Sequence, residues 1–133
     1  MTGLHCSSTL RVRYAETDQM GVAYHGNYFA WFEVGRTDLL RQLGLTYKQL
    51  EAEDVRLPVI ETKVTFRRPA LYDDVLEIRT QLVEMTGVRL TFEYDVLRSG
   101  EDEALARATT SHAAIDARGR PRRLPEELRR RLQ

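Results

Sequence analysis

The 133-residue sequence has few of the features that mark secreted, membrane or nucleic-acid-binding proteins. Its single cysteine, Cys6, cannot form a disulfide within the chain, which argues against a disulfide-stabilised extracellular domain. The formal net charge is zero, so no overall field attracts nucleic acid or anionic lipid. No apolar run is long enough to span a bilayer, and the first residues lack the basic and apolar segments of a signal peptide. We therefore expect a single domain over residues 1–133, located in the cytoplasm and away from membranes.

The most informative segment is residues 10–43, where a strand pattern leads through a loop into an apolar helix. Apolar and basic residues alternate up to Tyr14, and a half-buried strand is expected to continue to about Ala15. Gly21 and Gly26 then indicate a loop, and from Asn27 apolar side chains recur with helical spacing. Because charged residues are scarce in the first half of this helix, we expect it to be buried on most sides.

Asp18 lies in that loop, just before the helix begins. The first turn of a helix carries backbone N–H groups without intrahelical acceptors and a partial positive charge, and both stabilise an oxyanion. A carboxylate beside those groups can attack a bound carbonyl carbon or activate a water molecule. The spacing also fits an Asp18 that only caps a turn, so a catalytic and a structural role are both open from spacing alone.

The remainder of the chain predicts an α+β fold. A short helix is expected over 45–54, and alternating patterns indicate strands over 60–66, 76–82, 88–96 and 104–115, the middle two joined as a hairpin at Thr86-Gly87. Residues 1–9 are expected to be loose, and residues 125–133 to form a short helical tail. A long helix followed by antiparallel strands packs most economically as a curved sheet wrapped around that helix.

A resemblance to a known family is carried by the run Tyr14-Ala-Glu-Thr-Asp18-Gln-Met-Gly21-Val-Ala-Tyr24-His25-Gly-Asn27-Tyr28. This run resembles the signature segment of the hot-dog-fold acyl-CoA thioesterases, in the 4-hydroxybenzoyl-CoA thioesterase and YbgC-like branch. The resemblance continues through Phe32-Glu33, Arg36 and the run from Phe66 to Asp74, and covers about residues 10–117. It implies a hot-dog fold and hydrolysis of acyl-CoA to free acid and coenzyme A, without metal or redox cofactor. It also implies subunits that join edge to edge as a homodimer, often paired again as a homotetramer.

By the same resemblance, Asp18 is the catalytic nucleophile or general base. Tyr24 and His25 belong to the turn that opens the helix, where the backbone N–H of His25 would polarise the thioester carbonyl. The His25 ring either assists by donating to substrate or orienting water, or only packs. Asn27 either orients the Asp18 loop or caps the helix, and Tyr14 either lines the acyl pocket or belongs to the core.

The phosphates of coenzyme A favour arginines at the mouth of the site. Arg67, Arg68 and Arg89 are the candidates because they occur at strand ends or on outward faces, although each fits an ordinary solvated charge as well. Glu33 is the alternative catalytic carboxylate, because other hot-dog lineages place theirs on the central helix. The structural alternative for Glu33 is an ion pair, with Arg36 as the nearest partner, or an interface contact.

Other functions compete with hydrolysis. A non-catalytic acyl-CoA binding or sensor protein would keep the pocket without needing a reactive carboxylate, and a dehydratase would need a different His and carboxylate pairing. The run Arg118–Arg123 is similar to a minor-groove hook, but a turn explains Gly119 equally well, so nucleic acid is not an expected partner. His5, His25 and His112 lack the spacing of metal ligands, so no metal site is expected.

Overall fold

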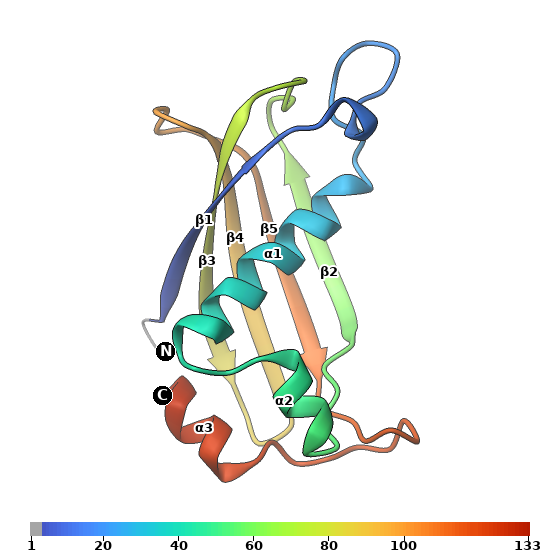
Figure 1. Cartoon of the computed structure of the whole chain (residues 1–133), viewed down its shortest axis with the longest axis vertical. Coiled ribbons are helices and arrows are strands. Elements are labelled where there is room, and N and C mark those ends of the chain that lie inside the picture. The colour runs from blue at the N-terminus through green and yellow to red at the C-terminus, as the bar shows by residue number, and fades with distance from the viewer. Residues whose placement is uncertain (1–3) are drawn as a thin grey trace.

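A computed structural model of the chain describes residues 4–133 (Figure 1). Residues 1–3, part of the stretch expected to be loose, lie outside the described residues. The elements follow in the order β1 (His5–Arg11), the 3-10 helix η1 (Tyr14–Glu16), α1 (Asn27–Gln42), α2 (Tyr47–Ala52), β2 (Val59–Phe66), β3 (Val75–Met85), β4 (Arg89–Arg98), β5 (Ala104–Ala113) and α3 (Glu126–Leu132).

Within residues 4–133 the strands form one antiparallel sheet of five strands, in the order β1-β3-β4-β5-β2. Helix α1 lies across one face of this sheet, with α2 and α3 at the end where α1 finishes (Figure 1). The alternating side chains of β4 that face α1 are buried, among them Phe92 and Tyr94. The predicted α+β architecture, a long helix wrapped by an antiparallel sheet, is confirmed.

The helix and the sheet approach each other closely at Gly35. A Cβ atom added at this position would lie 2.1 Å from Thr80 Oγ1 of β3, far inside van der Waals contact. One turn earlier, the Phe32 ring lies 4.7 Å from the Tyr94 ring of β4. Glycine at position 35 therefore lets α1 sit directly on the centre of the sheet.

A row of buried polar side chains crosses the same interior. The Tyr94 hydroxyl lies 2.5 Å from Thr110 Oγ1, which lies 2.8 Å from Nε2 of His112. Nδ1 of His112 lies 2.9 Å from the Leu57 carbonyl oxygen and donates to it. Burial lowers the pKa of His112 to about 4, so the ring is neutral near pH 7, with the nearby Arg36 acting in the same direction and the Leu57 bond opposing it.

The N-terminal part of the chain corrects two expectations. Residues 5–9 are not loose, because β1 begins at His5 and pairs with β3, from His5 opposite Gln81 to Arg11 opposite Val75. The strand then ends at Arg11 instead of continuing to Ala15, and Tyr14 lies in η1. The Cys-Ser-Ser-Thr composition of this segment is a weak strand signal, and the ladder with β3 determines its structure.

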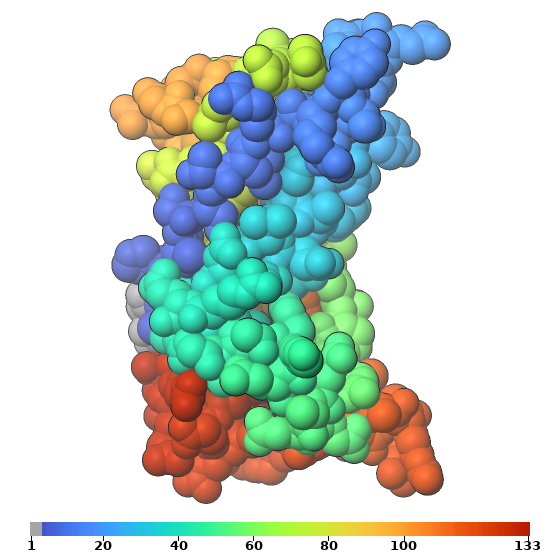
Figure 2. All heavy atoms as spheres, in the orientation of Figure 1, coloured from blue at the N-terminus to red at the C-terminus, as the bar shows by residue number. Residues whose placement is uncertain are grey.

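The first half of α1 is more exposed than expected. Phe29 is 48% exposed and Val34 40% exposed, whereas Tyr28, Trp31 and Phe32 are buried. The helix therefore buries one face against the sheet and leaves an apolar strip on the other. The loop between η1 and α1 projects from one end of the molecule, in blue in the space-filling view (Figure 2).

Candidate active site

Asp18 occupies a tight loop whose neck is closed by a bridge between Thr17 and Ala23. The Asp18 N–H donates to the Val22 carbonyl oxygen (2.9 Å). Oδ1 of Asp18 accepts hydrogen bonds from the N–H groups of Met20 (2.8 Å) and Val22 (3.3 Å). The side chain is exposed, and its second oxygen has no hydrogen-bond partner among residues 4–133. Asp18 thus uses one oxygen to hold its own turn and leaves the other available for chemistry.

The chain enters α1 through a turn at Tyr24, His25 and Gly26. The Asn27 N–H donates to the Tyr24 carbonyl (3.0 Å) and the Tyr28 N–H to the His25 carbonyl (3.1 Å). Within the described part of the chain, the N–H groups of His25 and Gly26 have no acceptor, and no side chain caps the helix. Two consecutive unpaired donors at a helix N-terminus form a suitable site for a developing oxyanion.

The His25 ring packs against aromatic side chains instead of entering a hydrogen-bond network. Its centroid lies 4.4 Å from that of Phe66, at the end of β2, and 6.2 Å from that of Tyr24. No hydrogen bond to either ring nitrogen occurs among the described residues. The ring therefore forms part of an aromatic wall, while the backbone of His25 presents its N–H.

A pocket of about 230 Å³ opens beside this turn. Its apolar lining and its two arginines come from the Asp18 loop, α1, the end of β2 and the segment that follows: Val22, Ala23, His25, Tyr28, Phe66, Arg67, Arg68 and Pro69. Asp18 is not in the lining, but Val22, whose N–H donates to the Asp18 carboxylate, is. The structure therefore brings His25, Arg67 and Arg68 to one cavity, and the hydrogen bond from Val22 connects Asp18 to its lining.

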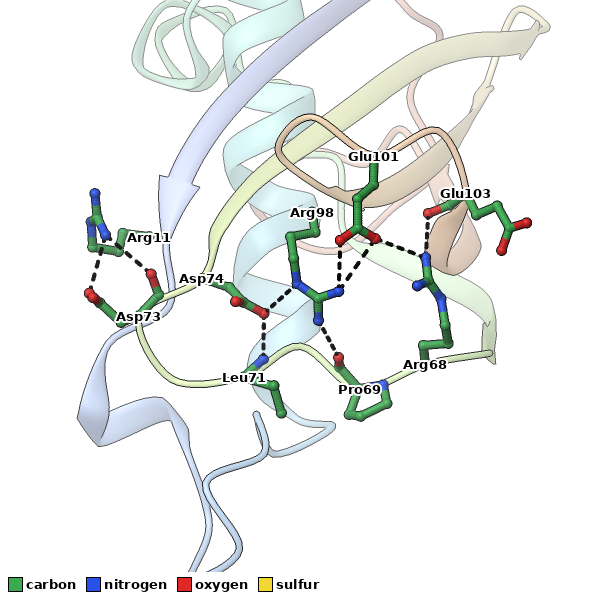
Figure 3. A network of polar contacts seen from close by, with 9 residues as sticks. All are labelled: Arg11, Arg68, Pro69, Leu71, Asp73, Asp74, Arg98, Glu101 and Glu103. Atoms are coloured by element: carbon green, nitrogen blue, oxygen red, sulfur yellow. Dashed lines mark hydrogen bonds and ion pairs between the residues drawn. The ribbon is translucent and has the colours of Figure 1, made fainter.

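The segment 69–74 supports the Asp18 loop from outside. The Ala23 N–H donates to the Ala70 carbonyl (2.8 Å) and the Tyr72 N–H to the Gly21 carbonyl (3.1 Å). This segment is itself held at both ends by Arg98 (Figure 3). Arg98 lies 3.0 Å from Asp74 Oδ2 and 3.2 Å from the Pro69 carbonyl oxygen, so one guanidinium joins the two ends of the turn.

Arg67 and Arg68 differ in their contacts although they are neighbours. Arg68 forms an ion pair with Glu101 (3.2 Å) and donates to the Glu103 carbonyl (3.0 Å), as Figure 3 shows. The exposed Arg67 side chain has no hydrogen bond or ion pair among residues 4–133. Only Arg67 therefore presents an unpaired guanidinium beside the pocket.

Comparison with known proteins assigns the chain to a family. The family model for the thioesterase-like superfamily matches residues 12–132. The chain belongs to the thioesterase-like superfamily. It is 36% identical over 107 residues to the putative acyl-CoA thioesterase YneP of Bacillus subtilis, covering 80% of this chain and 77% of YneP. It is 35% identical over 120 residues to the acyl-CoA thioester hydrolase YbgC of Escherichia coli, covering 90% and 89%.

Solved structures agree with the fold of this thioesterase-like chain. A hypothetical protein of Thermus thermophilus, TT1821, superposes with a TM-score of 0.89 at 42% sequence identity, and the match covers 95% of each chain. The resemblance carried by the Tyr14–Tyr28 run is thereby confirmed at the level of family and fold.

Asn27 and Tyr14 have positions that the sequence left open. The Asn27 side chain donates to the Glu16 carbonyl oxygen (2.8 Å) and does not cap α1, so it ties the chain before Asp18 to the helix. Tyr14 is 78% exposed and contacts the Tyr72 ring edge-on at 5.5 Å, so it belongs to the surface of this thioesterase-like domain and not to its core.

Glu33 and Arg89 lie apart from the pocket. Glu33 is exposed on α1, and the expected pair with Arg36 is wrong, because the Arg36 guanidinium faces the hydroxyls of Tyr47 and Tyr94 instead. Glu33 forms no ion pair within the described residues. Arg89 begins the 10-residue β4, about 30 Å along the strand from its Arg98 end.

Sequence reasoning missed Glu16 as a member of the site. The residue is only 7% exposed, although Tyr14 and Ala15 before it and Asp18 after it are exposed. Its carboxylate accepts hydrogen bonds from the Arg13 N–H (2.8 Å) and from Nε1 of Trp31 on α1 (3.0 Å). The only available signal was an acid two residues before Asp18 in the family-like run, and its tryptophan partner is 15 positions away.

Two further features are absent from the part of the chain that the structure describes. None of its helices is long and apolar enough to cross a membrane. None of its clusters of three or more His, Cys, Asp or Glu side chains has an arrangement that could hold a metal ion.

Proposed function

We propose that this chain hydrolyses acyl-CoA thioesters, with Asp18 as the reactive carboxylate and the His25–Gly26 turn as the oxyanion site. Membership of the thioesterase-like superfamily makes the chain a thioester hydrolase, and YneP and YbgC are named as acyl-CoA thioesterases. The observation that carries the residue assignment is a single closed loop. This loop holds a carboxylate oxygen without a partner and leads directly into two unpaired N–H groups.

The thioester carbonyl oxygen would accept hydrogen bonds from the His25 and Gly26 N–H groups, which stabilise the negative charge that develops on it. Asp18 can then act in one of two ways. It attacks the carbonyl carbon, expelling the coenzyme A thiolate and leaving a mixed anhydride that water hydrolyses. Alternatively it removes a proton from a water molecule that attacks the same carbon. Both routes release a free acid and coenzyme A and regenerate the carboxylate.

The pocket and its border supply the remaining contacts. The apolar lining from Tyr28 and Phe66 suits the acyl group, with the His25 ring forming one wall. The Tyr24 ring lies over Gly26, where an added Cβ would meet it at 3.0 Å, so Tyr24 flanks the amide turn. Arg67 is the candidate for the phosphates of coenzyme A, because its guanidinium has no other partner among residues 4–133.

The active unit is proposed to be a homodimer that pairs again as a homotetramer. β2 is the last strand of the sheet order and is exposed along nearly its whole length, with Val59, Ile60 and Phe66 more than 40% exposed. Pairing β2 with a second copy would satisfy its free backbone edge. Light scattering is expected to give two or four times the 15.4 kDa chain mass, and a monomer at micromolar concentration would contradict the proposal.

No cofactor is required by this chemistry, and the cytoplasm is the proposed location. The thiol of Cys6 plays no part in the proposed mechanism.

Replacing Asp18 by Asn tests the mechanism directly. Asn keeps the acceptor oxygen for Met20 and Val22 but removes the reactive carboxylate. Release of free thiol from a panel of short, aromatic and long acyl-CoAs is expected to fall roughly 10²- to 10⁴-fold. The melting temperature is expected to stay close to that of the parent protein.

Asp95→Asn is the matched control, because Asp95 lies on the sheet and pairs only with Arg107 on its surface (3.1 Å). This variant should keep parental turnover. Parental turnover in Asp18→Asn would remove Asp18 from the mechanism. Acyl-CoA binding by the parent protein without any thiol release would instead favour the non-catalytic sensor.

A further inference from the structure

Glu16 is the one buried acid among residues 4–133, and its side chain and its main-chain carbonyl contact different parts of the site. Its side chain reaches Trp31 on α1, while its carbonyl oxygen accepts from the Tyr24 N–H (2.9 Å) and from the Asn27 side chain (2.8 Å). Trp31 is itself only 2% exposed. The residue therefore links η1, the start of α1 and the turn that carries the oxyanion donors.

The carboxylate of Glu16 is fully satisfied. It accepts from the Arg13 N–H and the Trp31 indole, and the Arg13 guanidinium lies 3.5 Å away. Burial alone would raise the pKa of Glu16, but these hydrogen bonds and the charge of Arg13 outweigh it and lower that pKa. A buried carboxylate with this many donors keeps one fixed orientation.

The position of Asp18 depends on this anchor. Asp18 follows Glu16 by two residues, and its loop returns to Tyr24 through the Thr17–Ala23 bridge and the Tyr24 N–H bond to Glu16. Both ends of the loop therefore meet at Glu16. This loop sets the distance between the Asp18 carboxylate and the His25 N–H. Glu16 supplies its only buried acidic side chain.

We propose that Glu16 is a positioning residue, whose side chain accepts from Trp31 and Arg13 and thereby fixes the main-chain carbonyl that accepts from Tyr24 and Asn27, holding Asp18 at the correct distance from the His25–Gly26 donors. It touches no reacting atom. This inference rests on the proposed function. It adds Glu16 as a residue that affects the reaction only by placing Asp18.

Trp31 makes the anchor directly observable. It is the single tryptophan of the chain, and its indole N–H donates to the Glu16 carboxylate. Replacing Glu16 by Gln removes the charge from this acceptor while preserving side-chain length. The intrinsic fluorescence spectrum therefore reports the state of the anchor in the folded protein, without any added probe.

We expect Glu16→Gln to lower kcat roughly 10- to 100-fold, since a small misplacement of a catalytic group has effects of this size. The KM for acyl-CoA should change less than threefold, since the pocket lining is unaltered, and the Trp31 emission maximum should shift. Kinetics are measured at a temperature at which circular dichroism shows the variant to be folded.

Asp116→Asn is the matched control. Asp116 holds another turn by the same means, accepting from the N–H groups of Arg118 (2.9 Å) and Arg120 (3.0 Å) and pairing with the Arg120 guanidinium. A loss of turn-holding hydrogen bonds alone should lower the melting temperature in both variants. Only Glu16→Gln should lower kcat and change the fluorescence.

Trp31→Phe is the second variant, which keeps an aromatic ring but removes the indole donor. It is expected to lower kcat in the same direction by roughly two- to fivefold. Parental kcat in either folded variant, Glu16→Gln or Trp31→Phe, would overturn the inference. If Asp18→Asn also kept parental turnover, the proposed function would fail as well, whereas an inactive Asp18→Asn would confine the failure to Glu16.

Discussion

The interior of the sheet and the start of α1 both carry a histidine, in opposite surroundings. His112 is fully buried, and each of its ring nitrogens has a partner, in Thr110 and in the Leu57 carbonyl. His25 is exposed, and neither its ring nitrogens nor its N–H has a hydrogen-bond partner within residues 4–133. Groups in the first region have their hydrogen bonds satisfied by the fold, whereas groups in the second remain available to a ligand.

This difference explains why the stability of the fold and the chemistry of the site are separable. Buried polar groups stabilise the native state only when paired, so removing a partner in the interior is costly. At the start of α1, exposure lets one oxygen of Asp18 and the amide turn stay unpaired at little cost. Substitutions in the two regions should therefore affect different measurements, and the Asp18→Asn loss of turnover is the largest effect expected on the active-site side.

The largest effect expected in the interior region is a pH dependence of stability caused by His112. Its pKa is about 4 in the folded protein and about 6.5 when unfolded. Between these values the unfolded chain binds a proton that the native protein does not. The free energy of unfolding should therefore fall as the pH is lowered from 6.5 to 4, by up to about 1.4 kcal/mol per pH unit from this group alone. Urea unfolding at a series of pH values, at constant protein concentration, measures this slope.

His112→Gln is the control for that slope. Gln does not titrate, and losing the imidazole hydrogen bonds should make this variant about 1–3 kcal/mol less stable than the parent at pH 7. The difference between the two proteins should then shrink as the pH approaches 4, since only the parent loses stability through this residue. Carboxylates such as Glu77 and Glu101 titrate in both proteins and cancel. Parallel curves over the whole range would show that His112 binds its proton equally well in the folded and unfolded states, contrary to the expected lowering of its pKa.

The comparison also shows which parts of the structure a sequence can predict. The apolar periodicity of α1 and the alternation of β2 to β5 depend on local spacing, and these elements appear within a few residues of their predicted bounds, whereas β1 does not. The side of α1 that contacts the sheet does not follow from local spacing. Phe29 and Val34 were expected to be buried but are exposed, because the face opposite the sheet is covered by no element of the described chain.

Site residues likewise differ in whether their contacts are local in the sequence or join distant segments. Asp18 and the His25 turn lie within one contiguous run, so the sequence was enough to select them as candidates. The burial of Glu16 depends on Trp31, and the pairing of Arg68 depends on Glu101, contacts that form only when separate segments meet. Arg89 was selected because it begins a strand, but strand ends occur at both ends of a sheet, and only the topology shows which end carries the pocket.

Arg67 and Arg68 are neighbours, and the guanidinium of the first is free while that of the second is paired. Substitutions at these two positions are expected to have smaller effects. Arg67→Gln should raise the KM for acyl-CoA roughly fivefold, about 1 kcal/mol, because an unpaired guanidinium is lost for the phosphates. Arg68→Gln should change KM less and instead lower stability by up to about 1 kcal/mol, because it removes the Glu101 ion pair, whose partners are about 40% exposed.

A thioester of N-acetylcysteamine, which has the thiol end of coenzyme A but no phosphate, separates phosphate binding from general damage to the pocket. Arg67→Gln should hydrolyse this substrate as the parent does, since the missing charge has nothing to bind. An equal rise in KM for both substrates would mean that Arg67 shapes the pocket. Equal changes in the KM for acyl-CoA in Arg67→Gln and Arg68→Gln would mean that the Glu101 ion pair does not distinguish the two arginines. Because both residues line one cavity and differ mainly in their acidic partners, this pair of variants tests whether a free charge, and not its location alone, makes a binding group.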